Sequence, residues 1–333
     1  MRGLATLMGA TVFVCLALEV AVRLVIDDGM HFYLEMWKYA RDIKQRSEDS
    51  LIGHEHRPNA RSFLMGVEVS TNSYGQRDRE FKVARPPRGK RIVMLGDSFV
   101  LGWGVPLEQT VSKRIERMFA ASGQRVEVMS TGVGNYNTVM EVQAFLTKYA
   151  PFAPDLVVLN YTFNDAEPVP KYEGVGLITR YSQAYTVSLG AFDAALRLAR
   201  ISRQPWDEYY LGLYQTPGWQ AAQASAHRLA RYCNEHGIAL VVVNWPELHD
   251  TRNYQLGAIT NHVRDMAKAA GVPFLDLLDA LKGQDPAKLW VTPPDPHPNG
   301  FANQLYAEHM FPFIARALAE AGRGKVVQSE PRP

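Results

Sequence analysis

A serine follows a short apolar run at residues 91–98, "RIVMLGDS". Reactive groups in open α/β sheets gather where strands reach their carboxyl edge, and Ser98 stands at such an end. Taken alone, a serine there is a turn former or a helix cap. It becomes a candidate nucleophile if the chain also holds a base and a third group that orients the base.

Candidates for those two partners stand late in the chain, in "WVTPPDPHPNGFANQLY". His297 follows Asp295 by two residues, and side chains two apart in extended backbone point to the same side. Asp295 could therefore accept a hydrogen bond from His297 Nδ1 while Nε2 faces Ser98, and the three flanking prolines restrict the loop. The alternatives are a loop pair that caps the last helix and a metal site, which lacks further ligands nearby.

Two more segments follow predicted strands. "STGVGNYNT" holds Gly132 and Gly134, whose missing side chains let backbone approach a ligand closely. "YTFND" places Asn164 and Asp165 at a strand end. Taken alone, the first is an ordinary glycine turn and the second a helix cap.

The elements that must position these residues alternate along the chain beyond Lys90. Short apolar runs separated by amphipathic helices predict parallel strands that are covered on both faces. The expected fold class is a three-layer α/β/α sandwich with right-handed crossovers. The predicted strands lie at 91–98, 126–132, 155–165, 238–247 and 273–281, and the predicted helices at about 108–121, 138–149, 219–235 and 253–270.

The alternation is interrupted over about residues 166–218, which predicts a partly helical insert because ordinary connections are far shorter. Tyr209, Tyr210, Tyr214 and Trp219 could line a substrate cleft, or they could pack the insert onto the sheet.

The N-terminus carries an apolar stretch at residues 4–26 whose only charges are Glu19 and Arg23. A helix of this length can cross a bilayer, and charges four residues apart on one helix face can pair or reach toward the interface. A cleaved signal peptide is the alternative, but no small-x-small site follows the apolar run. We therefore expect residues 1–28 to form an uncleaved transmembrane anchor.

The remaining organisation is predicted from composition shifts. Residues 29–85 form a juxtamembrane helix, which holds the domain off the membrane, and an extension with a short strand or hairpin near Val67 and Val69. The main domain covers 86–321, and 322–333 is a flexible tail.

Bulk composition excludes several classes. A content of 47% hydrophobic residues supports a sizeable core, and 36 Lys plus Arg against 34 Asp plus Glu gives no electrostatic basis for binding nucleic acid. Cys15 and Cys233 lie in separate predicted parts, so we expect two free thiols. The chain has no nucleotide-binding glycine loop after its first strand.

Four blocks occur in one order: "GDSF" at 96–99, the glycine of "STGVGNYN", "FND" at 163–165 and "DPH" at 295–297. Together they resemble the SGNH, or GDSL, hydrolase superfamily over about residues 71–315. The stretch from "TNSYGQRDREF" to "GDSFVLGWGV" is also similar to members found with bacterial surface-polysaccharide synthesis genes.

This resemblance implies a flavodoxin-like fold and a serine esterase site. Ser98 would be the nucleophile, His297 the general base and acid, and Asp295 its orienting partner. The oxyanion hole would consist of the backbone N–H groups of Ser98 and Gly132 and the side-chain amide of Asn164. The resemblance implies no metal ion and no organic cofactor.

Two departures from the family pattern stand out. Thr162 replaces the glycine that usually begins the third block, and Asp295 precedes His297 by two residues where three are common. The G-x-S-x-G elbow of α/β-hydrolases is absent, since Val100 occupies its last position. Within the first block, Asp97 is interpreted as a structural residue beside the nucleophile.

Three residues outside the blocks are also considered. Trp103 is a packing residue or a border of the acyl pocket. His249 and Asp250 are interpreted as a solvated loop pair.

The expected function is removal of O-acyl groups, such as acetyl, from an envelope or exported glycan, or from a small ester. Polysaccharide-synthesis proteins are candidate partners. The soluble domain is expected outside the cytoplasm, in the periplasm of a Gram-negative bacterium, or secreted if the N-terminus is cleaved. Two rivals stay open: an O-acyltransferase that uses the same triad, and a non-catalytic glycan-binding or assembly protein.

Overall fold

A computed structural model of the chain describes residues 2–85, 87, 89–172, 174–201, 204–293 and 295–328. Five parallel strands form its central sheet, in the order β6-β5-β7-β8-β9. This is the strand order of flavodoxin-like proteins, so the predicted fold class is confirmed. The strands are β5 (Lys90–Leu95), β6 (Val126–Ser130), β7 (Leu156–Tyr161), β8 (Ala239–Asn244) and β9 (Phe274–Asp276).

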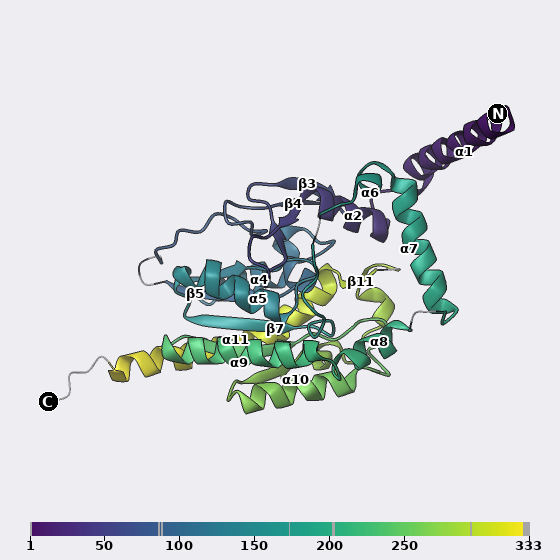
Figure 1. The fold of residues 1–333 in the computed structure, drawn as a ribbon. Coiled ribbons are helices and arrows are strands. Elements are labelled where there is room, and N and C mark those ends of the chain that lie inside the picture. Colours follow the sequence, from purple (N-terminus) through teal and green to yellow (C-terminus); the bar gives the residue numbers. More distant parts are fainter. Residues whose placement is uncertain are drawn as a thin grey trace.

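Helices cover both faces of the sheet, as Figure 1 shows. Every residue of β7 is buried, and its side chains alternate between the two layers: Leu156 and Val158 pack on one side, Val157 and Leu159 on the other. One layer contains α4 (Val111–Ala121) and α11 (Gly300–Gln328), and the other contains α5 (Thr138–Ala144), α9 (Pro217–Glu235) and α10 (Gly257–Ala269).

Local capping fixes where several of these elements begin. The Thr110 hydroxyl accepts the Lys113 backbone N–H before α4, and Asn137 accepts the Met140 N–H before α5. The last predicted strand, 273–281, is shorter than expected. It stops at residue 276 because the chain turns into a 3-10 helix (Leu277–Leu281), whose first turn is capped by the side chain of Asp276.

The described part of the insert holds three helices, α6 (Leu177–Tyr181), α7 (Gln183–Leu198) and α8 (Trp206–Leu213). The four aromatic residues considered for a cleft pack against the core beside it. Tyr214 and Trp219 are buried, and Tyr209 and Tyr210 are partly buried.

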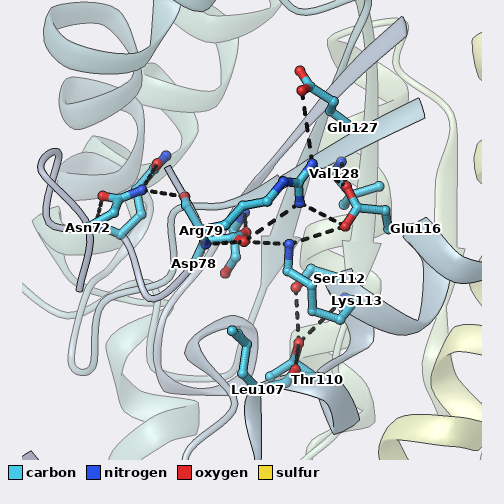
Figure 2. A network of polar contacts seen from close by, with 12 residues as sticks. Asn72, Asp78, Arg79, Leu107, Thr110, Ser112, Lys113, Glu116, Glu127 and Val128 are labelled. Atoms are coloured by element: carbon cyan, nitrogen blue, oxygen red, sulfur yellow. Dashed lines mark hydrogen bonds and ion pairs between the residues drawn. The ribbon is translucent and has the colours of Figure 1, made fainter. Parts of the chain in front are cut away.

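The N-terminal extension packs onto the domain. It contains α2 (Phe32–Asp42), the antiparallel pair β1 (Lys44–Arg46) and β2 (His54–His56), and the hairpin β3 (Arg61–Leu64) and β4 (Val67–Ser70). Figure 2 shows the polar network that joins the extension to α4. Asp78 forms a buried ion pair with Lys113, and Arg79 donates to both oxygens of Glu116 at 2.9 Å.

At the N-terminus, α1 (Arg2–Ala21) continues as a π-helical turn (Val22–Ile26). Within the described part of the chain this is the one helix that is long and apolar enough to cross a membrane, a test that a signal sequence also passes. Glu19 and Arg23 pair, as predicted, at 2.6 Å. At the other terminus α11 continues through the start of the predicted tail, whose residues 329–333 lie outside the described ones.

Candidate active site

Ser98 begins a single helical turn, α3 (Ser98–Leu101), directly beyond the carboxyl end of β5. The Asp97 side chain caps this turn by accepting the Phe99 backbone N–H at 2.9 Å, which agrees with the structural role predicted for it. Gly102 ends the turn with a positive φ of 74°. The strand, the cap and the glycine together hold Ser98 at the sheet edge.

His297 faces Ser98 from the far end of the chain. The distance between Ser98 Oγ and His297 Nε2 is 2.8 Å. Asp295 Oδ1 contacts His297 Nδ1 on the other side of the ring. Because a carboxylate only accepts, Nδ1 carries the proton of the neutral imidazole, and Nε2 is free to accept the Ser98 hydroxyl.

A short hairpin presents this pair. Strands β10 (Trp290–Thr292) and β11 (Asp295–Pro298) pair with an irregular register, so Asp295 and His297 lie in extended backbone. Of the three prolines that flank the pair, Pro294 lies outside the described residues. The hairpin therefore supplies the extended geometry on which the spacing argument depends.

The Asp295 carboxyl is completely buried. Its Oδ2 accepts the Trp103 indole N–H at 2.9 Å, and its Oδ1 accepts the His297 backbone N–H at 3.1 Å. Burial alone would raise the pKa of Asp295, but the facing His297 and these hydrogen bonds outweigh it and hold that pKa below its ordinary value. Trp103 is buried, which agrees with the packing role considered for it, and its indole N–H also fixes the position of the Asp295 carboxylate.

Gly132 packs directly on the nucleophile turn. A Cβ at this position would lie 2.3 Å from the Leu101 nitrogen and 2.7 Å from the Val100 carbonyl carbon. Only glycine lets the loop approach this closely. Among the described residues, no group accepts a hydrogen bond from the Gly132 N–H, so this donor is available to a ligand.

Asn164 is oriented by Thr162, the residue that replaces the family's usual glycine. The Thr162 hydroxyl lies 2.6 Å from Asn164 Oδ1, which leaves the amide Nδ2 without an acceptor among the described residues. The same hydroxyl lies 3.1 Å from Asp165 Oδ1 and 3.2 Å from Asp97 Oδ2. One hydroxyl can donate only once, and the shortest of these contacts is the one to Asn164 Oδ1.

Asp165 is completely buried in this cluster. Burial, with the nearby Asp97 charge, raises its pKa well above the ordinary value. With the Thr162 hydroxyl donating to Asn164 Oδ1, the NH₂ group is the part of the Asn164 amide that can donate to a ligand.

Two residues of the extension support the site and were missed by sequence reasoning. The buried Arg77 guanidinium donates to the carbonyls of Leu101, Gly102 and Val105 at 3.1, 2.6 and 2.8 Å and so closes the end of α3. The Tyr39 hydroxyl accepts the Gly134 N–H at 2.8 Å, in the loop that follows Gly132. Both contacts join distant segments and leave no local pattern in the sequence.

The predicted spacer helix α2 also reaches the site. The ring of Phe32, its first residue, stacks on that of His297 with a centroid distance of 6.3 Å. The helix therefore packs over the domain, and its role in holding the domain off the membrane stays a prediction.

The residues kept off the site lie in turns. His249 is exposed and bonded to Glu247, and Asp250 accepts two backbone N–H groups of its own loop. In the described residues, no group of three or more His, Cys, Asp or Glu side chains is arranged to hold a metal ion.

The sequence profile of the GDSL-like Lipase/Acylhydrolase family matches residues 94–305, and the chain belongs to this family. The predicted superfamily is thereby confirmed, and with it the enzyme class, hydrolases that act on carboxylic esters. No curated protein matches the chain in sequence.

Several solved structures are similar to this one. The lipase/acylhydrolase from Enterococcus faecalis has 14% identity and a TM-score of 0.43, over 70% of this chain and 96% of that one. The esterase EstA from Pseudoalteromonas sp. has 14% identity and a TM-score of 0.46, over 69% and 99%. A two-domain esterase active on acetylated mannans has 14% identity and a TM-score of 0.42, over 70% and 50%.

Proposed function

We propose that the protein is a serine esterase that removes O-acyl groups, such as acetyl, from an envelope or exported glycan. Ser98 is the nucleophile, His297 the base and acid, and Asp295 the residue that orients His297. The proposal rests chiefly on the 2.8 Å contact between Ser98 Oγ and the His297 nitrogen that is free to accept its proton.

Catalysis begins when Ser98 Oγ attacks the ester carbonyl and His297 Nε2 takes the hydroxyl proton. The carbonyl oxygen becomes an oxyanion, which accepts hydrogen bonds from the Ser98 and Gly132 N–H groups and the Asn164 amide. His297 then passes its proton to the leaving sugar oxygen, and the carbon–oxygen bond breaks. The acyl group remains on Ser98.

Water completes the cycle. His297 removes a proton from water as the water oxygen attacks the acyl carbon, and the second tetrahedral intermediate uses the same three donors. Its collapse releases the carboxylic acid and returns the proton to Ser98. Asp295 stays ionised throughout and stabilises the imidazolium each time it forms.

The proposed location of the protein is based on its N-terminal helix. We propose that residues 1–28 anchor the protein, that the hydrolase domain at 86–321 lies outside the cytoplasm, and that polysaccharide-synthesis proteins are its partners. The apolar composition of residues 2–26 supports the anchor.

The test measures where the acyl group goes. The full chain in detergent is incubated with an acetylated glycan, and released acetate is measured for wild type, Ser98→Ala and the control Ser122→Ala, an exposed serine on α4's C-terminal cap. Acetate released by wild type and Ser122→Ala but not by Ser98→Ala supports the proposal. Acetyl found on an added acceptor glycan would identify a transferase instead, and binding without turnover would identify a binding protein.

A further inference from the structure

Two helices of the insert present apolar side chains to solvent. On α7, Leu189 is 48% and Phe192 is 64% exposed. With Tyr185 they recur at spacings of four and three residues, so they form one stripe along the helix. The neighbouring α6 exposes Leu177, Ile178 and Tyr181.

The opposite side of α7 is already occupied. Gly190 lies against the Tyr33 ring of α2, and a Cβ at Gly190 would stand 2.6 Å from a ring carbon. The two charged side chains of α7, Asp193 and Arg197, pair with each other at 2.9 Å. The stripe itself consists of uncharged, exposed side chains, and the charge of the neighbouring Asp193 is compensated by Arg197.

The N-terminus of α7 is hydrogen-bonded to the C-terminal end of α1. The Glu19 carboxylate accepts the Ser182 hydroxyl at 2.8 Å and the Gln183 and Ala184 backbone N–H groups at 3.0 Å. The Arg23 guanidinium donates to the Tyr181 carbonyl at 3.0 Å. Figure 1 shows α1 projecting from the body of the molecule, and α7 starting beside the end of α1 and running from there along the side of the molecule.

We propose that the apolar stripe of α7 and the exposed apolar residues of α6 lie in the headgroup region of the bilayer that α1 spans. The proposal rests on α1 being the membrane anchor. An amphipathic helix of this kind lies in the membrane plane with its apolar side about 5–10 Å deep. Residues 171–206 carry five basic and two acidic side chains, which favours an anionic lipid surface.

Chain length supports the lipid bilayer as the occupant. Phe32 begins α2 six residues after Ile26, where the apolar helix ends. Six extended residues reach at most about 22 Å. Since α2 packs against α7, the insert cannot lie far from the membrane surface once α1 is inserted.

The test places a fluorescent nitrobenzoxadiazole label at single cysteines of the full chain in vesicles of phosphatidylcholine and phosphatidylglycerol. Leu189→Cys and Phe192→Cys, each in a Cys15→Ser background, report on the stripe. Val83→Cys, which is 45% exposed on the loop before β5, is the matched control. Native Cys15 reports on α1, and Cys233 is buried.

Lipids that carry a nitroxide near the headgroup quench labels at that depth. We expect labels at 189 and 192 to lose most of their fluorescence and the label at 83 to keep it. If a nitroxide at the acyl-chain end quenches the Cys15 label but the labels at 189 and 192 stay bright, α1 is inserted and the stripe does not touch the bilayer, which would overturn the proposal. An unquenched Cys15 label would overturn it as well, because α1 would then not be in the membrane. A disulfide between two copies through Phe192→Cys would show that a second copy, not lipid, covers the stripe.

Discussion

Replacing Asp295 by asparagine tests how the carboxylate orients His297. Asparagine keeps the shape but offers one acceptor oxygen and one NH₂ donor. Because the Trp103 indole N–H, 2.9 Å from Oδ2, can only donate, the asparagine oxygen turns toward Trp103 and its NH₂ toward His297. The His297 backbone N–H opposes this turn through a longer bond of 3.1 Å. The imidazole then keeps its proton on Nε2 and cannot accept the proton of Ser98.

The magnitudes follow from this geometry. The wrong tautomer lowers kcat by about 10⁴ in Ser-His-Asp enzymes, or about 5.5 kcal/mol. Adding Trp103→Phe to Asp295→Asn removes the donor that selects this orientation. One hydrogen bond is worth about 1 kcal/mol, so the double variant regains about fivefold. In the wild-type background Trp103→Phe removes a hydrogen bond to the charged Asp295 carboxylate and lowers activity about tenfold or more.

The assay is kcat for hydrolysis of p-nitrophenyl acetate by the wild type, both single variants and the double variant. Trp245→Phe is the matched control, because it removes a buried indole N–H that donates to Asn160 Oδ1 at 3.0 Å instead. We expect it to give no gain in the Asp295→Asn background. If Trp103→Phe lowers activity by the same factor in both backgrounds, Trp103 does not select the orientation.

Three further predictions concern the oxyanion site and stability. Asn164→Ala lowers kcat for ester hydrolysis about a hundredfold or more, since one oxyanion donor is worth about 3–4 kcal/mol; an unchanged initial rate would remove its assigned role. Lys113→Met removes the nearer cation of the buried Asp78 and leaves it Arg79, 3.9 Å from its Oδ1, so the free energy of unfolding in urea falls by about 3 kcal/mol. Burial lowers the pKa of His54 and of His56 to about 3. Below about pH 6.5 the unfolded chain binds protons at these histidines and the folded chain does not. The free energy of unfolding therefore falls by up to about 1.4 kcal/mol per pH unit for each histidine as the pH drops toward 3. Equal urea midpoints above and below pH 6 would contradict this.

The central sheet could be predicted because its inner strands are continuous apolar runs. All six residues of β7 are buried, and all of β5 except its first. A strand covered on both faces is apolar at most positions. The buried polar residues of these two strands, Arg91 and Asn160, are hydrogen-bonded to backbone carbonyls. This pattern predicts the three-layer sandwich, whereas the flavodoxin-like strand order is what the family resemblance implies.

The packing of the extension could not be predicted in the same way. In α2 the buried side includes Glu35, whose carboxylate accepts the Met65 backbone N–H at 2.8 Å and pairs with Lys38. A charged residue on the buried side obscures the amphipathic pattern, so the sequence predicts a solvent-exposed spacer helix.

The residues that form the candidate triad could be predicted from their spacing, but their supports could not. Trp103 and Arg77 each act through a buried hydrogen bond to a residue that is distant in the sequence. Thr162 bonds to the nearby Asn164, but it stands where the family usually has glycine. Neither leaves a period or a motif from which a role can be inferred.

The central claim is that Ser98 is an activated nucleophile, and a fluorophosphonate tests it most directly because the reagent bonds only to such a serine. The intact mass of the full chain is measured after treatment, alongside Ser98→Ala and His297→Ala. We predict a single adduct that maps to Ser98 and is absent from both variants. No adduct on the folded wild-type chain, or an adduct that persists in Ser98→Ala, would contradict the account.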